Sequence, residues 1–288
     1  MVNSNNEITI VIISHKSKKK VINLISGISN NLEIVIVENS YDRSIENEIS
    51  NLKKNIKLIF SENNGYGSAI NLARKYINTK YFFVLNPDIK KIDDKFIKVF
   101  YDSATELNDN FGALGPRFIN VSDKSHKQSN INEKFGHIES IQGSCMFFCS
   151  EIFDKNDGFD ENIFLYFDET DYCYRSNKNG FKIYQINSQE INHEIGTSVE
   201  TTSEEESNKL KNLYIWHFIW SKFYFFKKKY GKFISFIMFI PILLRIIIRI
   251  YFSTISGNKK NKIKYKIRLN GLISSFKNNK SYKRIEDF

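Results

Sequence analysis

"ITIVIISHKSKKKVINLISGISNNLEIVIVENS", residues 8–40, contains two runs of β-branched residues and, between them, a segment with helical spacing. Residues 8–14 and 33–40 predict two buried strands, because short continuous apolar runs are typical of strands covered on both faces. Val21, Leu24 and Ile25 recur at the spacing of one helix face. Strand, helix and strand in this order predict a βαβ unit.

The same pattern continues along the chain. Residues 55–64 and 81–88 predict two more strands, and residues 67–79 predict a helix between them. Strands that alternate with helices indicate an α/β fold with a mostly parallel central sheet. Residues 121–137 are rich in Ser, Asn and Lys and predict an irregular loop.

Polar residues follow each of the four predicted strands. Ligands of parallel sheets bind at the carboxyl ends of the strands, so we expect these residues to lie together at a binding edge. They are Ser14, Glu38, Asn64, Gly65, Asn86 and Asp88.

Asp88 in "LNPDI" is a candidate metal ligand. Mg²⁺ and Mn²⁺ prefer oxygen ligands and often share them with substrate phosphates. The alternative is an Asx-turn, since Asn-Pro-Asp is common turn chemistry. His193 in "NHEIGTS" is a candidate second ligand, although a lone histidine is more often structural.

Gly65 and Gly67 in "NNGYGSAIN" open the predicted helix at 67–79. They permit close approach of a ligand to a helix N-terminus, which suits an anion. An ordinary strand-to-helix turn explains the same glycines.

The stretch "NIFLYFDETDYCYR", residues 162–175, places Asp168, Glu169 and Asp171 within four positions. A helix over about 170–179 makes Asp168 its N-cap and Asp171 its third residue, an approximate capping box. That arrangement gives Glu169 no structural role. A carboxylate beside aromatic residues at a helix N-terminus is a candidate general base.

Two neighbours support the helix that follows this acid cluster. Gly180 is typical of the residue just past a helix C-terminus. Asp171 and Arg175 are four residues apart, the spacing of an ion pair on one helix face.

Charge divides the chain into two regions. Residues 207–288 contain 19 Lys and Arg against 2 Asp and Glu, a net +17, while residues 1–206 contain 23 against 30, a net −7. The two values add to the formal net charge of +10. An acidic region suits a cation and a basic region suits an anionic partner.

Residues 233–252 are nearly all apolar except for Arg245 and Arg249, and Pro241 interrupts them. About 20 apolar residues suffice to span a bilayer. Two arginines make a full span costly, so a helix lying in the membrane interface is the favoured interpretation. A buried helix between domains is the alternative.

The three cysteines, Cys145, Cys149 and Cys173, are odd in number and lack paired spacing, which argues against a disulfide framework. The apolar residues near the start are short, β-branched and preceded by no basic segment, so they predict a strand and not a signal peptide. We therefore expect a reducing, cytoplasmic location.

Together these segments resemble glycosyltransferase family 2, in the branch that includes bacterial rhamnosyltransferase-like enzymes. The resemblance covers about residues 8–200 in collinear order. Its motifs are "VIISHKS", "VIVENSYD", "NNGYGSAINLA", "FVLNPDI", "GALGPRF", "GSCMFF", "GFDENIFLYFDETDYCYRSNKNGFKI" and "HEIGTS".

The resemblance implies a GT-A nucleotide-sugar-binding domain over residues 1–206. Residues 207–288 then form a helical, basic, membrane-associating region. The implied reaction is inverting transfer of rhamnose, or of another deoxyhexose or hexose, from a nucleoside-diphosphate sugar. The implied acceptor is a hydroxyl of a lipid-linked or polysaccharide chain in bacterial surface-glycan biosynthesis, on the inner face of the cytoplasmic membrane.

The resemblance also assigns roles to single residues. Glu169 corresponds to the catalytic base, with Asp168 as the alternative because the family usually has Glu before Asp. Asp88 and His193 correspond to ligands of Mg²⁺ or Mn²⁺. The implied substrate-binding residues are Ser14, Glu38, Asn64, Gly65, Asn71, Asn86 and Asp171.

Three other functions are weighed against this one. A sequence pI of 9.2 with a basic, aromatic tail is compatible with nucleic-acid binding, but it leaves the acidic region unexplained, so no nucleic-acid partner is expected. An inverting glycoside hydrolase needs a second catalytic acid. A non-catalytic family member would bind the sugar nucleotide without transferring it.

Overall fold

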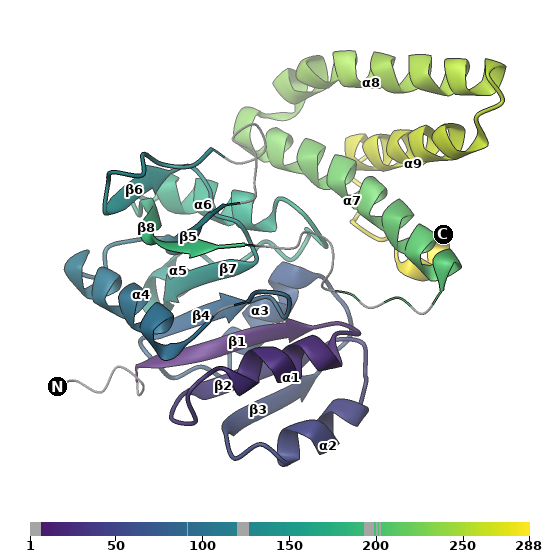
Figure 1. Cartoon of the computed structure of the whole chain (residues 1–288). Coiled ribbons are helices and arrows are strands. Elements are labelled where there is room, and N and C mark those ends of the chain that lie inside the picture. The colour runs from purple at the N-terminus through teal and green to yellow at the C-terminus, as the bar shows by residue number, and fades with distance from the viewer. Residues whose placement is uncertain (1–6, 91, 120–126, 193–198, 200, 202) are drawn as a thin grey trace. The chain divides into compact units, whose positions relative to one another are not determined.

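The computed structural model describes residues 7–90, 92–119, 127–192, 199, 201 and 203–288. The chain divides into two compact units (Figure 1). The sheet unit comprises Met1–Asp160 and Glu169–Glu200, and the helical unit comprises Glu161–Asp168 and Thr201–Phe288.

An eight-stranded sheet runs through the described part of the sheet unit, in the order β3-β2-β1-β4-β7-β5-β8-β6. Its strands are β1 (Ile8–Ser14), β2 (Glu33–Glu38), β3 (Asn55–Phe60), β4 (Tyr81–Leu85), β5 (Ala113–Phe118), β6 (Phe135–Ile138), β7 (Cys145–Cys149) and β8 (Ile183–Ile191). The pairs β3-β2, β2-β1 and β1-β4 are parallel, while β7 and β6 run against their neighbours. The expected mostly parallel α/β sheet is confirmed.

The order of the strands creates a switch point beside β1. From β1 the chain proceeds outward to β2 and β3, and then returns to place β4 on the other side of β1. Open α/β sheets bind their ligands at the carboxyl ends of the strands that flank such a point. The site is therefore expected between the ends of β1 and β4.

Strand residues alternate between two cores. Ile10 and Ile12 of β1 face one core and Val11 and Ile13 face the other, as the two-residue period of a strand requires. The first core is covered by α1 (Lys18–Ser26), α2 (Ser44–Ser50) and α4 (Asp94–Glu106), and the second by α3 (Tyr66–Arg74) and α6 (Asp168–Lys178) (Figure 1). The short α5 (Ser150–Lys155) follows β7 directly.

The helix α2 and the strand β6 are among the elements that the sequence did not predict. The helix α2 contributes only Ile45 and Ile49 to the core, which is too weak a period to recognise in the sequence. The strand β6 lies partly within the predicted 121–137 loop. It was missed because its pairing with β8, and not its own composition, makes it a strand. All three cysteines are free and buried.

The helical unit contains α7 (Glu204–Tyr230), α8 (Lys232–Ile255) and α9 (Lys259–Phe276), and ends in a short 3-10 turn (Ile285–Asp287). Ser203 caps α7 by accepting a hydrogen bond of 3.1 Å from the Glu206 amide. Pro241 lies inside α8 without ending it. The core of the unit is Ile219, Phe223, Phe239, Ile246 and Leu272.

His217 of α7 forms hydrogen bonds with residues near the end of the chain. Its Nε2 lies 2.9 Å from the Lys283 carbonyl, which only accepts, so Nε2 carries the proton. Its Nδ1 then accepts from the Ser281 hydroxyl at 2.9 Å. Burial lowers the pKa of His217 to about 4, which keeps the ring neutral in this arrangement near pH 7.

Candidate functional site

Ser14 and Glu38 lie opposite each other at the ends of β1 and β2. The Ser14 hydroxyl donates to the Glu38 carboxylate. The backbone amide of Ser40 donates to Glu38 Oε1 at 2.7 Å, and the Ser40 hydroxyl donates to the same oxygen. Glu38 is buried and thus holds two serine hydroxyls at the end of the sheet.

The next residue, Asn39, provides a polar atom at the same edge. Its side chain is buried, and its Oδ1 has no hydrogen-bond partner among the described residues. Its carbonyl lies 3.4 Å from His15 Nδ1, and burial lowers the pKa of His15. An unsatisfied buried amide oxygen is costly, so a ligand N–H or O–H group is favoured here.

The end of β4 forms a tight turn. The Ile89 amide donates to the Asn86 carbonyl at 3.1 Å, with Pro87 at the second position, which is typical of a β-turn. The turn is thus closed by the backbone, while Asn86 Oδ1 accepts from the Tyr66 hydroxyl at 2.7 Å. Asp88 is carried by this turn and is only 6% exposed.

Glu169 approaches the same region from α6. A methyl group placed on Gly143 would lie 3.7 Å from Glu169 Oε2 and 3.7 Å from the Tyr66 ring. The Tyr66 hydroxyl also lies 2.7 Å from the Gly143 carbonyl. The structure therefore brings Glu169, Tyr66 and Asn86 together around Gly143. Glu169 lies in the first turn of α6, where the helix dipole favours an ionised carboxylate.

Asp168 does not cap α6. The helix begins at Asp168 itself, so the capping-box prediction is wrong by one position. The residue before it, Phe167, has a positive φ of 65° and no side-chain oxygen that could accept a hydrogen bond from the first backbone amides of the helix. Asp168 is buried, and its Oδ2 has no hydrogen-bond partner in the described part of the chain.

The predicted ion pair between Asp171 and Arg175 is present, with Oδ2 and Nε 2.8 Å apart. Arg175 also donates to the carbonyls of Asn156 and Gly158, the latter at 2.6 Å. Asp171 is fully buried. Its geometry is that of a structural residue that fixes α6 to the loop after α5.

Asn71 has a similar structural position. Its Nδ2 donates to the Phe159 carbonyl, and its Oδ1 accepts from the Phe159 amide, both at 2.9 Å. Its amide therefore joins α3 to the chain after α5. Asn64 is exposed, and Gly65 occupies the N-cap of α3 with a φ of 111°, a conformation that favours glycine.

The residues at this edge fit a metal ion that shares its ligands with a substrate. Asp88 supplies a carboxylate at a strand end, and Mg²⁺ or Mn²⁺ accepts phosphate oxygens for its remaining positions. No group of three or more His, Cys, Asp or Glu side chains that could hold a metal occurs among the described residues. His193, the other predicted ligand, lies outside the described residues.

Sequence reasoning did not single out Tyr66 or Gly143. Tyr66 stands between the two glycines of "NGYG", and Gly143 opens "GSCMFF". Both stretches were noted as motifs. Only the fold reveals that the tyrosine and the glycine meet beside Glu169.

Comparisons with known proteins show which family and which fold this chain resembles. The family model of glycosyl transferase family 2 matches residues 9–156, just over half of the 288 residues. The low-salt glycan biosynthesis hexosyltransferase Agl10 of Haloferax volcanii is 25% identical over 201 residues, which is 62% of this chain and 64% of that protein. The chain thus matches slightly less than two thirds of that relative's length.

Solved structures resemble the fold. The mannosyltransferase PcManGT of Pyrobaculum calidifontis, in complex with GDP-Man and Mn²⁺, matches 93% of this chain and 86% of its own, with a TM-score of 0.60 and 8% identity. Residues 1–349 of TarS from S. aureus, in complex with UDP-GlcNAc, match 96% and 93%, with a TM-score of 0.54 and 13% identity. At such low identity the likeness shows the fold, which is that of GT-A glycosyltransferases.

Proposed function

This chain belongs to glycosyl transferase family 2, and on that premise we propose that it transfers a sugar, with inversion, from a nucleoside-diphosphate sugar to an acceptor hydroxyl. The observation that carries the proposal is the meeting of Glu169, Tyr66 and Asn86 around Gly143, next to the turn that bears Asp88. A carboxylate at one position and a metal-binding acid at another are what a single displacement requires.

In this reaction the acceptor oxygen bonds to the sugar C1 as the bond from C1 to the diphosphate breaks. Glu169 takes the proton of the acceptor hydroxyl. Asn86 and Tyr66 hold the β4 turn and the start of α3 in fixed relation, which favours a constant distance between base and leaving group. Asp88 and His193 are the residues that would hold a divalent metal, and such a metal would supply positive charge for the departing diphosphate.

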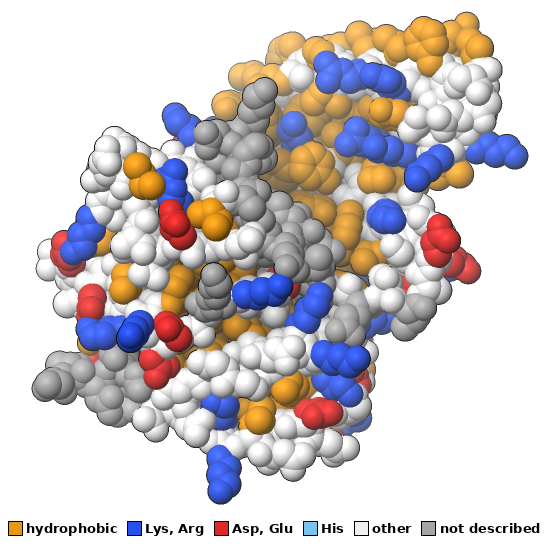
Figure 2. All heavy atoms as spheres, viewed as in Figure 1, with side chains coloured by type: hydrophobic (Ala, Val, Ile, Leu, Met, Phe, Trp, Pro, Cys, Tyr) orange, Lys and Arg blue, Asp and Glu red, His pale blue; other side chains and the backbone are white. Residues whose placement is uncertain are grey.

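A lipid-linked glycan acceptor is supported by the surface of α8. Twelve of its large apolar side chains are exposed, from 39% at Ile240 to 77% at Phe233, and Figure 2 shows hydrophobic side chains along the outer edge of this helix. So large an apolar surface is typical of an interaction site. The twelve exposed apolar residues of α8 are Phe233, Ile234, Phe236, Ile237, Met238, Ile240, Leu244, Ile247, Ile248, Tyr251, Phe252 and Ile255.

We propose that this face lies in the headgroup region of an anionic bilayer. Within the described residues, α8 is the one helix long and apolar enough to cross a membrane. However, α8 packs against α9 in the core of the unit, and α9 carries five lysines and Arg268 between residues 259 and 268. Burying these charges in hydrocarbon is costly, whereas at an anionic surface each contributes about 1 kcal/mol.

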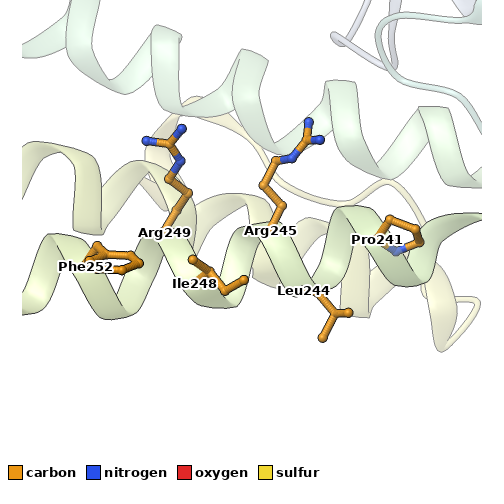
Figure 3. Close-up of a pocket in the computed structure, with 6 residues that line it drawn as sticks. All are labelled: Pro241, Leu244, Arg245, Ile248, Arg249 and Phe252. Atoms are coloured by element: carbon orange, nitrogen blue, oxygen red, sulfur yellow. The ribbon is translucent and has the colours of Figure 1, made fainter.

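Arg245 and Arg249 also fit a helix α8 that lies in the headgroup region. Arg245 and Arg249 extend side by side from α8 (Figure 3). With Pro241, Ile248 and Phe252 they line an open pocket. Long basic side chains beside apolar ones are suited to reach phosphate headgroups. We therefore expect the protein at the cytoplasmic face of the membrane.

Vesicle co-sedimentation tests this surface. The full chain is expected to bind vesicles with anionic headgroups and to bind neutral vesicles much more weakly, with binding reduced by salt. The double variant Phe233→Ser, Phe252→Ser is expected to lose most of this binding. The variant Ile119→Ser, which removes an apolar side chain of 59% exposure in the sheet unit, serves as the control. Equal binding of all three proteins would refute the α8 surface.

A thermal-shift screen tests the donor proposal. UDP-, GDP- and dTDP-linked hexoses and deoxyhexoses are each added with Mn²⁺ and with EDTA. A true donor at 100 times its Kd stabilises the fold by about 2.7 kcal/mol, and we expect this effect to require the metal. A chain that no sugar nucleotide stabilises, with or without metal, is not a transferase of this class.

A further inference from the structure

The segment that leads into Glu169 belongs to the helical unit, although Glu169 itself belongs to the sheet unit. We call residues 161–168 the acid loop. The chain passes from Asp168 to Glu169 within the first turn of α6. Whatever fixes the acid loop therefore also fixes the start of this helix and the base that it carries.

The acid loop ends in an unfavourable backbone conformation. Tyr166 and Phe167 have positive φ values of 66° and 65°, in the left-handed region that bulky residues rarely adopt. Neither residue offers the short polar side chain that usually caps a helix. Such a conformation persists only where surrounding contacts over-determine it.

Contacts with α7 supply this restraint. The Ser221 hydroxyl donates to the Leu165 carbonyl at 2.8 Å. The Phe218 ring packs against Tyr166 at 5.6 Å and against Phe167 at 5.7 Å between ring centroids. Phe218 and Ser221 are three residues apart and thus share one face of α7.

The end of the chain holds the other part of the acid loop. The Phe164 ring lies 4.6 Å from the His217 ring, between centroids, and the Arg284 guanidinium lies 4.1 Å from the Phe164 centroid. His217 is in turn fixed by Ser281 and Lys283. The acid loop is therefore held by α7 and by the C-terminal tail together.

We propose that α7 and the C-terminal tail position the catalytic base through the acid loop. Ser221, Phe218 and Arg284 are then positioning residues, which act through residues 164–167 and the start of α6. The inference rests on the proposed role of Glu169 as the base.

Kinetics of Ser221→Ala test the proposal. A misplacement of about 1 Å costs roughly 100-fold in rate, so we expect kcat to fall roughly 10- to 100-fold while the donor KM stays unchanged. The matched control is Ser275→Ala, since Ser275 is also buried and donates to a backbone carbonyl, that of Trp220, at 3.0 Å. The proposal is overturned if both variants change kcat equally.

A second pair of variants distinguishes the proposed positioning role from general unfolding of the helical unit. Arg284→Met removes the guanidinium over Phe164 and keeps an unbranched side chain. Arg268→Met removes a similar contact over Tyr265, at 6.0 Å, within α9. A fall in kcat is expected for the first alone, and equal effects would contradict the proposal.

Amide hydrogen exchange separates this inference from the proposed function. In Ser221→Ala, exchange of residues 163–172 is expected to accelerate at least about tenfold relative to Ser275→Ala, as local opening of the segment becomes easier. Unchanged exchange would refute the restraint even if transfer activity is found. Accelerated exchange in a chain that transfers no sugar would refute the proposed function and leave the restraint intact.

Discussion

Replacing Glu169 by glutamine is expected to lower the rate of sugar transfer about 100- to 10,000-fold, the usual contribution of a positioned general base. The substitution keeps the size and the hydrogen-bonding shape of the side chain beside Gly143 and Tyr66. It removes only the ability of this side chain to take the proton from the acceptor hydroxyl. The measurement is kcat with a donor and acceptor pair found by screening, together with donor binding by thermal shift, which should be unchanged.

Two further variants are a control for Glu169→Gln and a test of the alternative base. Glu151→Gln changes an exposed glutamate that pairs with Lys155 on α5, and it should leave kcat at the wild-type value. Asp168→Asn tests the alternative base. Asp168 is nearly fully buried while Glu169 is half-buried, so we expect the smaller loss for Asp168→Asn. A larger loss there, with Glu169→Gln active, would transfer the role of base to Asp168.

Replacing Asp88 by asparagine is expected to lower transfer at least about 100-fold, because loss of metal-borne charge at a leaving diphosphate is a loss of several kcal/mol and each 1.36 kcal/mol is tenfold. The variant should also lose the Mn²⁺-dependent part of the donor-induced thermal shift. Treatment of the wild-type protein with EDTA should reduce its rate to a similar level.

The control for this variant is Asp102→Asn, which changes an exposed aspartate paired with Lys98 on α4. It should retain both activity and the metal response. If Asp88→Asn keeps a normal Mn²⁺ response, the metal is bound elsewhere and the turn after β4 has only a structural role. If EDTA leaves the wild-type rate unchanged, transfer does not depend on the metal.

Much of the fold was predictable because buried parallel strands have a strong local pattern. The continuous β-branched run at 8–14 gives a strand in any sheet that covers both its faces. Two of the missed elements, β6 and α2, have weak patterns of their own. β6 is a four-residue strand that depends on β8 for its hydrogen bonds, and α2 exists because the sheet covers its two isoleucines.

The site was predictable in part for the same reason. Residues at strand ends are placed by the strands, so Ser14, Glu38 and Asn86 lie at the predicted edge. Asp171 and Asn71 lie on helices and were assigned through the family resemblance, and their side chains are engaged by Arg175 and by the Phe159 backbone. Which polar group is engaged internally depends on contacts between residues distant in the chain, and a sequence pattern does not contain them.

By itself the sequence determined that this is a parallel α/β protein with polar strand ends, an acid cluster at a helix start and a basic, apolar C-terminal region. These properties follow from local periodicity and from charge. Only the tertiary structure decided that Glu169 meets Tyr66 at Gly143, and that the acid loop before it is held by α7. The physical reason is that the left-handed conformation of Tyr166 and Phe167 is unfavourable for the isolated segment, so packing from a distant helix has to fix it.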